Sequence, residues 1–500
     1  MKTELKQQKS ALTQAALNTA SHLIILLPQD CLKPKSKQAW PKLPFEETLK
    51  QRLKRSGDSD AILITDLPNK ASTHITLSGI KADIGRFELL TLARKLAAPH
   101  LAQNPTTVSI TAAGFTDEEA APLIKAVVAA LLAASCDMPS FKSKAAKPSK
   151  LRSIQVLGAK KRIDFSRTIA EADGNNLARQ LTTLPPNELT PAIYHKRIAK
   201  LAKEHNWKVA FLDQATLKRK KAGAFLAVCQ GSSERDAGIV HLRYTPKRGR
   251  RKQTPLALVG KGICFDTGGI NLKPAQYMHG MHEDMQGSAV ALGTFLTLTQ
   301  LKVPYVVDCW LALAQNHIGP NAYKQNDVVT ASNGVTIEVM HTDAEGRMVL
   351  ADTLVQAAKL KPALIIDYAT LTGACHYSLS ARYSGGFTNR DVLIDEVISA
   401  GRNSGERVWP FPIDADFDDE LKSNVADVKQ CTLGGEADHI LASRFLQRFV
   451  GDTPWLHLDL SSGNSKGGLA HIPTDITGFG VNFTTQLLFD NEALSKVNKT

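Results

Sequence analysis

The chain has 500 residues, of which 43% are hydrophobic and 22% are charged, and its formal net charge is +13. This composition excludes an intrinsically disordered protein, and the length exceeds the size at which a single hydrophobic core stops growing, so two domains are expected. No apolar run approaches the ~20 residues that a membrane-spanning helix needs, so no membrane partner is expected.

The first third of the chain alternates short apolar runs with helix-like stretches. Strands are predicted at 22–28, 61–67 and 107–113, and helices at 86–98 and 117–135. This alternation predicts α/β layering. A basic stretch containing serine and proline, residues 139–152, is interpreted as a surface loop near the end of a first domain that covers residues 1–165.

A second α/β pattern begins at about residue 166 and defines a larger domain over residues 166–500. Strands are predicted at 207–213, 224–230, 239–244, 255–260, 303–314 and 363–371, and helices at 285–301 and 347–360. Several of these strands are apolar enough to be buried on both faces, as in parallel sheets covered by helices. The predicted fold class is therefore α/β, with two domains.

The positive charge is concentrated in the first domain. Residues 1–165 hold 25 Lys and Arg against 14 Asp and Glu, a net charge of +11, which leaves +2 for the remainder. A basic domain can attract DNA or RNA, but a solvated, lysine-rich surface gives the same count. Charge alone leaves both interpretations open.

The cysteines and the amino terminus indicate the compartment. The seven cysteines are odd in number and widely scattered, and no two have CxxC spacing. Reduced thiols are therefore expected, with neither a disulfide framework nor a thiolate zinc site. The first 21 residues lack the basic start and the cleavage pattern of a secretory signal. We therefore expect a cytoplasmic protein.

Two acid-rich loops follow predicted buried strands. After "LALVG", the stretch "KGICFDTGGINLKPAQYMHGMHEDMQG" carries Lys261, Asp266, Lys273 and Asp284, and the stretch "VMHTDAEGRMVLADTL" carries Asp343, Glu345 and Arg347. Ligands of α/β proteins gather outside the carboxyl ends of strands. If the second stretch enters as a strand, Asp343 and Glu345 point to the same side because residues two apart do so.

Charge counting favours a metal site over isolated surface acids. Four clustered carboxylates carry about four negative charges, which two divalent cations would neutralise, and such a pair can activate water for hydrolysis. Each acid taken singly is equally consistent with a loop carboxylate or a helix cap. Neither a Walker motif nor a Rossmann fingerprint is present in the sequence.

The motifs resemble those of the leucine (cytosol) aminopeptidase family of dinuclear metallopeptidases. The resemblance spans residues 170–490, through "LPPNELTP", "VGKGICFDTGGINLKP", "MHEDMQG", "HTDAEGRMVLADTL" and "DYATLTGA". It implies a catalytic domain with a mixed, mainly parallel central sheet. It also implies a macro-like amino-terminal α/β domain with an oligomerisation or regulatory role.

The resemblance implies two manganese or zinc ions held by Lys261, Asp266, Asp284, Asp343 and Glu345. Asp266 and Glu345 would bridge the ions, Lys261 and Asp284 would complete one site, and Asp343 would complete the other. A lysine ligand must be neutral, which costs about 4 to 5 kcal/mol at pH 7. Two adjacent dications would offset that cost.

The resemblance also implies a mechanism. A metal-bridging hydroxide would attack the peptide, Lys273 would act as the electrophile, and bicarbonate bound to Arg347 would shuttle the proton. The structural alternative for Arg347 is a salt bridge to Glu345 or Asp343. The substrate amine would bind a metal, which explains exopeptidase selectivity. The residues expected to bind substrate are Met281, for which core filling is the alternative, Thr370, Leu371 and Gly373.

Several positions depart from the family pattern. His341 stands where the family usually has Asn, and Gln315 where it has Glu. Ser461 and Asn464 would make one wall of the side-chain pocket polar, which puts a preference for leucine in doubt. His279 and His282 are interpreted as exposed loop residues.

Three function hypotheses follow. The first is a cytoplasmic, hexameric metallo-aminopeptidase that acts on peptides or dipeptides. The second is a nucleic-acid-binding regulator that uses the basic amino-terminal domain, with or without peptidase activity. The third, a dinuclear phosphoesterase, is disfavoured by the lysine ligand and by the lack of a histidine-rich cage.

Overall fold

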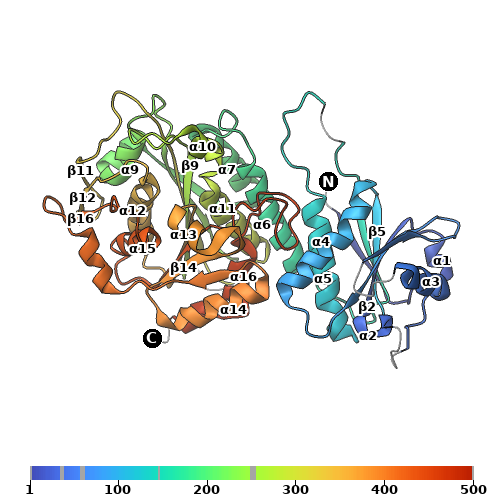
Figure 1. Cartoon of the computed structure of the whole chain (residues 1–500). Coiled ribbons are helices and arrows are strands. Elements are labelled where there is room, and N and C mark those ends of the chain that lie inside the picture. The colour runs from blue at the N-terminus through green and yellow to red at the C-terminus, as the bar shows by residue number, and fades with distance from the viewer. Residues whose placement is uncertain (1–2, 34–38, 57–61, 145–146, 248–254, 498–500) are drawn as a thin grey trace. The chain divides into compact units, whose positions relative to one another are not determined.

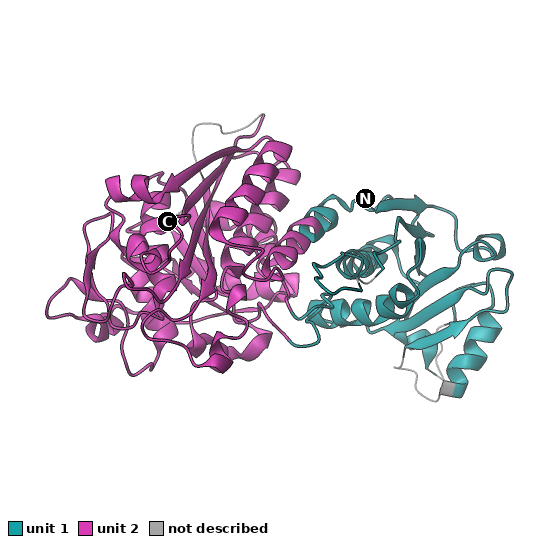
Figure 2. Cartoon of the chain, turned by 90° about the horizontal axis from the view of Figure 1, so that it is seen from above, with its two compact units in different colours: residues 1–172, 466–475 teal, residues 173–465, 476–500 magenta. Residues whose placement is uncertain are grey.

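The computed structural model describes residues 3–33, 39–56, 62–144, 147–247 and 255–497. The chain forms two compact units, shown in two colours in Figure 2. One comprises residues 1–172 together with 466–475, and the other comprises residues 173–465 together with 476–500. The division falls inside helix α6 (Ser166–Thr182). The short segment 466–475, near the carboxyl terminus, belongs to the amino-terminal unit.

The amino-terminal unit is built on one sheet. Its strands are β1 (Glu4–Gln8), β2 (His22–Pro28), β3 (Leu63–Asp66), β4 (His74–Ile80), β5 (Thr107–Ala112) and β6 (Ser153–Leu157), and its helices are α1 (Gln14–Leu17), α2 (Gln29–Leu32), α3 (Glu46–Ser56), α4 (Arg86–Ala102) and α5 (Asp117–Ala134). The strand order is β1-β6-β5-β2-β4-β3, and only the β3–β4 pair is antiparallel. Helices α4 and α5 lie side by side (Figure 1).

The sequence predicted part of this unit. The expected strands at 22–28, 61–67 and 107–113 correspond to β2, β3 and β5, whereas β1, β4 and β6 were not predicted. The expected helices correspond to α4 and α5. Helix α5 begins with a capping box in which Thr116 and Glu119 bond each other's backbone amides, a signature that fixes a helix start locally. The described residues of 139–152 form neither helix nor strand, as expected of a loop.

The larger unit contains an eight-stranded sheet. Its strands are β7 (Lys208–Asp213), β8 (Gly238–Tyr244), β9 (Leu256–Asp266), β10 (Val307–Asn316), β13 (Leu364–Ala369), β14 (Ser384–Thr388), β15 (Val408–Pro410) and β17 (Trp455–Asp459). The order is β15-β14-β17-β13-β9-β10-β8-β7. Strands β17, β13, β9 and β10 are mutually parallel, so their carboxyl ends share one edge. The sheet is therefore mixed, with a parallel centre.

Smaller elements complete this unit. A three-stranded sheet consists of β11 (Val328–Thr330), β12 (Thr336–Glu338) and β16 (Val428–Lys429). The helices are α7 (Pro191–His205), α8 (Gln214–Arg219), α9 (Gly223–Cys229), α10 (Ala275–Met278), α11 (Gln286–Gln300), α12 (Glu345–Ala358), α13 (Gly373–Leu379), α14 (Ile394–Ser404), α15 (Asp438–Gln447), α16 (Val481–Phe489) and α17 (Ala493–Lys496).

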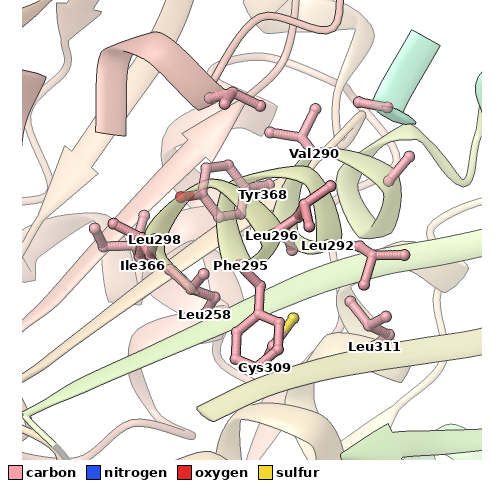
Figure 3. Packing of buried hydrophobic residues seen from close by; sticks show 14 of the residues in the cluster. Leu258, Val290, Leu292, Phe295, Leu296, Leu298, Cys309, Leu311, Ile366 and Tyr368 are labelled. Carbon is pink, nitrogen blue, oxygen red and sulfur yellow. The ribbon is translucent and has the colours of Figure 1, made fainter. Parts of the chain in front are cut away.

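The central strand β9 is buried on both faces. Leu258 packs with Phe295 of α11 in one apolar cluster, and Val259 packs with Met348 of α12 in another, because successive strand residues point to opposite faces. Figure 3 shows the first cluster, in which Leu311 also takes part. Helices therefore cover both faces of the parallel centre of the sheet.

One sequence prediction for this unit is wrong. Residues 224–230 were expected to form a strand but belong to α9, a helix that packs against α12. A short, wholly apolar run carries no periodicity that separates a strand from a buried helix. The first turn of α9 is instead stabilised by a distant partner, since the amide of Phe225 donates to Asp352 Oδ2 at 2.9 Å.

Within the described ranges, none of the helices combines the length and the apolar character needed to cross a lipid bilayer.

Candidate functional site

The predicted site residues come together at the carboxyl edge of the parallel strands. β9 ends at Asp266, β10 at Asn316, β13 at Ala369 and β17 at Asp459. The loops that follow β9, β13 and β17 line one cleft of about 800 Å³, together with His341, Asp343 and Glu345 at the start of α12. The sheet topology therefore brings together loops that lie far apart in the sequence, as is usual for open α/β sheets.

The first cluster of charges surrounds Lys261. Its Nζ lies 2.7 Å from Asp284 Oδ1 and 2.9 Å from Glu345 Oε1, and it donates to the Thr370 carbonyl at 3.0 Å. Thr370 also donates its hydroxyl to Asp284 Oδ1 at 2.8 Å. The side chain of Lys261 is only 4% exposed, so its ammonium has carboxylates in place of water.

The second cluster surrounds Lys273. Its Nζ lies 2.9 Å from Asp266 Oδ2 and 2.6 Å from Asp343 Oδ1. Asp266 Oδ1 accepts two further hydrogen bonds at 2.8 Å, from the Gly268 amide and from Asn316 Nδ2. Lys273 is more exposed than Lys261 and lines the cleft, so its charge faces the space that a ligand would enter.

The carboxylates fit a pair of metal ions. Oxygens of Asp266, Asp343 and Glu345 all lie within 4.8 Å of one another. Glu345 Oε2 and Asp284 Oδ2 are buried and accept no hydrogen bond from the described residues. Buried carboxylate oxygens are normally hydrogen-bonded or bound to a cation, so these two offer lone pairs suited to metal ligation.

The acidity of the site is perturbed as expected for crowded carboxylates. Burial, reinforced by the charges of Asp266 and Glu345, raises the pKa of Asp343 to about 7, against the opposing effect of Lys273. Burial also raises the pKa of Asp284 well above its usual value. For Lys261, burial disfavours the ammonium, but the surrounding carboxylates outweigh it and raise the pKa. Without metal, the site therefore holds protons that a metal would displace.

The expected strand geometry at Asp343 and Glu345 is wrong, although the two carboxylates do converge. Strand β12 ends at Glu338, residues 342–344 form a turn, and Glu345 is the first residue of α12. Tertiary hydrogen bonds fix this turn. The Thr342 carbonyl accepts from Tyr323 Oη at 2.7 Å and from Asn316 Nδ2 at 3.0 Å.

Gln430 braces the same loop from the other side. This fully buried side chain accepts from the amides of Met340 and His341, both at 3.2 Å, and donates to the Ala344 carbonyl at 2.9 Å. The main-chain carbonyl of Gln430 accepts from Arg347 Nη1 at 3.1 Å. One glutamine thus connects the acidic loop to the arginine.

Arg347 pairs with an acid that the sequence analysis did not name. Its Nη2 donates to Asp438 Oδ1 at 2.8 Å and to Asp438 Oδ2 at 3.0 Å. The proposed alternatives were bicarbonate or a salt bridge to Glu345 or Asp343. Burial disfavours the charge of Arg347, but Asp438 outweighs this effect and raises the pKa of the guanidinium.

The cleft contains the residues expected to bind substrate. Its lining includes Met281, Thr370, Leu371 and Gly373. Ser461 and Asn464 lie on its wall as well, and Asn464 Nδ2 donates to Glu283 Oε2 at 2.8 Å. The wall predicted to be polar is polar.

The positions where the sequence departs from the family pattern, and the two loop histidines, are placed as follows. His341 lines the cleft, and its Nδ1 accepts from the Asp343 amide at 3.2 Å, so the neutral ring carries its proton on Nε2. Gln315 is buried at the end of β10. His279 is exposed and His282 is half-buried.

Four residues of the site were missed from the sequence: Asn316, Gln430, Asp438 and Asp459. Asn316 and Asp459 had a usable signal, because each is the last residue of a parallel strand. Asn316 ends β10, which lies beside β9, and Asp459 ends β17, which lies beside β13. Asp459 accepts from the amides of Leu371 and Thr372 at 3.0 and 3.1 Å and so shapes the substrate loop. Gln430 follows only the two-residue strand β16, and Asp438 begins a helix, so only the fold reveals them.

Comparisons with known proteins agree with this geometry. The sequence profile of the "Cytosol aminopeptidase family, catalytic domain" matches residues 176–485. A "Probable cytosol aminopeptidase" of an Acidovorax species is 42% identical over 334 residues, which cover 67% of this chain and 66% of that protein. The corresponding protein of a Polaromonas species is 36% identical over 407 residues, covering 81% and 79%. This chain thus matches about two thirds of the Acidovorax protein's length.

Two solved structures share the fold over almost the whole chain. A tomato leucine aminopeptidase mutant has a TM-score of 0.86 and 29% identity, covering 98% of this chain and 97% of that one. The bottromycin maturation enzyme BotP in complex with Mn has a TM-score of 0.80 and 28% identity, covering 94% and 100%.

Proposed function

The chain belongs to the cytosol aminopeptidase family, whose members are metal-dependent hydrolases, and we propose that it removes amino-terminal residues from peptides or dipeptides. The observation that carries this proposal is the convergence of four carboxylates and Lys261 beside an 800 Å³ cleft. A site of this kind suits a small, polar substrate whose free amine is a further metal ligand.

The proposed ligands of two divalent ions are Lys261, Asp266, Asp284, Asp343 and Glu345. When bound, such a pair supplies an activated water for hydrolysis and an anchor for the substrate amine. With two ions bound, the positive charge of Lys261 would no longer be needed to compensate the carboxylates, so Lys261 could bind as a neutral amine. Manganese is supported by the similarity to BotP, which was solved in complex with Mn, and zinc suits the same donor set.

Lys273 is the proposed electrophile. In the protein without metal it is cationic, since burial disfavours its charge but Asp266 and Glu345 outweigh that effect and raise its pKa. Its ammonium lines the cleft, where it would donate to the carbonyl oxygen of the scissile bond and stabilise the negative charge that develops there. Met281, Thr370, Leu371 and Gly373 would hold the substrate around it.

Bicarbonate, which the resemblance places on Arg347, does not fit the arginine as it stands. The guanidinium already donates to Asp438 and to the main-chain carbonyl of Gln430.

The proposed setting is the cytoplasm, and all seven cysteines are free, as expected of a reducing compartment. A homo-hexamer is proposed from the family resemblance, with the amino-terminal unit in an oligomerisation or regulatory role. The proposed domain limits are 1–165 and 166–500, close to the boundary between residues 172 and 173 that separates the two compact units.

A panel of substrates tests the reaction class. Aminoacyl amides of leucine and alanine, cysteinylglycine and a phosphate ester are assayed with manganese and with zinc. We expect hydrolysis of the amino-terminal substrates, and its loss in the Asp266→Ala variant. Hydrolysis of the phosphate ester alone, or full activity in that variant, contradicts the proposal.

The second proposed function is nucleic-acid binding, supported by the charge of +11 on residues 1–165. Phosphate-driven binding weakens steeply as salt rises. Electrophoretic mobility shifts at low and moderate salt test it, and an absence of binding at low salt excludes it.

A further inference from the structure

The ion pair between Arg347 and Asp438 occupies the part of the guanidinium that binds planar anions. A guanidinium has two edges that offer a pair of parallel N–H groups, and both edges include Nη2. In this chain, Nη2 donates to both oxygens of Asp438, at 2.8 and 3.0 Å. Nη1 donates to the Gln430 carbonyl at 3.1 Å. An anion from solution cannot make a two-point contact here without displacing Asp438.

The pair is held by rigid elements rather than by flexible surface side chains. Arg347 is 2% exposed and lies in the first turn of α12, two residues after Glu345. Asp438 is the first residue of α15, a helix that packs against α12. A carboxylate at a helix amino terminus is stabilised by the helix dipole. The position of Asp438 is therefore built into the packing of two helices.

The backbone before Asp438 is strained, which is consistent with a specific role for its position. Ala437 has φ 50° and ψ 24°, in the left-handed region that is unfavourable for alanine. A residue held in this region costs of order 1–3 kcal/mol and persists only when the surrounding structure requires it.

The pair also lies near the cleft. The charges of Asp438 and Arg347 both act on the ring of His341, which lines the cleft and accepts from the amide of Asp343. Since the side chain of Asp438 is 25% exposed, water and small anions can reach the carboxylate.

We propose that Asp438 is a built-in substitute for a dissolved oxyanion at Arg347, so that peptide hydrolysis by this chain does not depend on bicarbonate. This inference rests on the proposed aminopeptidase function. A carboxylate and a bicarbonate present the same planar pair of oxygens, and the one supplied by the chain needs no binding from solution. Asp438 is thus a positioning residue that keeps Arg347 neutralised and oriented beside the acidic loop.

The test compares bicarbonate dependence in the manganese-loaded wild-type protein and in the Asp438→Ala and Asp438→Asn variants. Assays begin in buffer depleted of carbon dioxide, and bicarbonate is titrated at constant pH and ionic strength. Wild-type kcat should change less than twofold. Asp438→Ala should start at least ~10-fold lower, the order of one charge-assisted hydrogen bond, and recover saturably with bicarbonate or formate. Asp438→Asn, which keeps the volume but not the charge, should lose activity and recover less.

Asp418→Ala is the matched control. Asp418 also forms a two-point salt bridge with an arginine, at 2.9 and 2.6 Å, but its partner is Arg444 of α15 and not Arg347. Its loss should leave the bicarbonate response unchanged. Melting temperature and manganese content are measured for every variant, so that a folding defect is not mistaken for a lost anion site.

Two results would overturn the inference. One is strong activation of the wild-type protein by bicarbonate, since Asp438 would then yield its place. The other is a folded, metal-loaded Asp438→Ala variant that ignores bicarbonate and formate. If no form hydrolyses peptides, the proposed function fails separately, and calorimetric titration of bicarbonate still decides this point. Bicarbonate that binds to Asp438→Ala but not to the wild type supports the proposed role of Asp438. Equal binding to both proteins, or binding to neither, refutes it.

Discussion

Lys261 and Glu345 form a 2.9 Å ion pair in which the two side chains are 4% and 1% exposed. Such a pair is stable only if both charges stay compensated. Glycine makes room for it, since a Cβ at position 346 would lie 2.6 Å from Lys261 Cε. The first turn of α12 therefore determines where the lysine nitrogen lies.

The Gly346→Ala substitution should weaken metal binding without removing any ligand. The added methyl group forces Lys261 away from Asp284 and Glu345, and displacement of a ligand by its surroundings typically costs 10- to 100-fold in metal affinity, so we expect a loss of about that size. Equilibrium dialysis against manganese measures it. Gly85→Ala is the control, because a Cβ there has no neighbour within 4 Å. Unchanged affinity in Gly346→Ala would mean that Lys261 is not a ligand.

The Gln430→Leu substitution should lower the stability of the larger unit. Gln430 satisfies the partly buried amides of Met340 and His341 and the Ala344 carbonyl, and leucine leaves them unpaired. Each such group costs about 1–3 kcal/mol, so a total loss of roughly 2–4 kcal/mol is expected after relaxation.

Calorimetric unfolding with chelator present checks this value. Gln325→Leu is the matched control: its side chain donates to the Met340 carbonyl at 2.7 Å but is exposed, so water replaces it at little cost. Equal destabilisation by both substitutions would refute the bracing role of Gln430.

The amino-terminal unit should lose stability in mild acid. Burial, followed by the charges of His74 and His22, lowers the pKa of His100 to about 3. Its Nδ1 lies 3.2 Å from His22 Nδ1, and Thr76 lies against its Nε2. Asp66 lies against the ring of His74 and not against His100.

The sign follows from proton binding. The unfolded chain protonates this histidine near pH 6.5 and the folded chain only near pH 3, so stability present above pH 6.5 is lost as the pH falls between these values. From pH 6.5 to 5 the loss from His100 alone is about 2 kcal/mol, at 1.36 kcal/mol per unit. Hydrogen exchange of β2 and β4 measures it, and His100→Gln should flatten the dependence. An equally steep profile in that variant would refute the assignment.

The polar wall of the cleft should reduce the preference for leucine. Asn464→Ala removes an exposed polar side chain from this wall, and a change of this kind in a side-chain pocket is worth about 1–3 kcal/mol. The ratio of kcat/KM for leucine over serine amides should therefore rise ~10-fold. Ser378→Ala, at an exposed position on α13, is the control. A ratio that stays constant would place the side-chain pocket elsewhere in the cleft.

The sequence predicted what local patterns encode. Strands such as β2 and helices such as α5 carry their own periodicity and caps, and the motifs around Asp266 and Glu345 identified the acidic residues. The convergence of these residues followed from a general rule about parallel sheets. Residue patterns thus sufficed for the fold class and for finding the acidic residues and lysines that line the cleft.

What the sequence did not predict depends on contacts between distant segments. Helix α9 looked like a strand because its stabilising partner, Asp352, lies more than 100 residues away. The partner of Arg347 lies 91 residues further along the chain, at the start of a helix rather than at the end of a predicted strand. No window of sequence contains both halves of either contact, so only the packed structure shows them.

The central claim is that Lys261 and the four carboxylates hold two divalent cations. Crystals grown with manganese and measured by anomalous scattering test it most directly. We expect two peaks roughly 3.5 to 4 Å apart, with Lys261 Nζ coordinated to one of them and turned away from Asp284. A single peak, or two peaks with the Lys261–Asp284 ion pair intact, would contradict the claim.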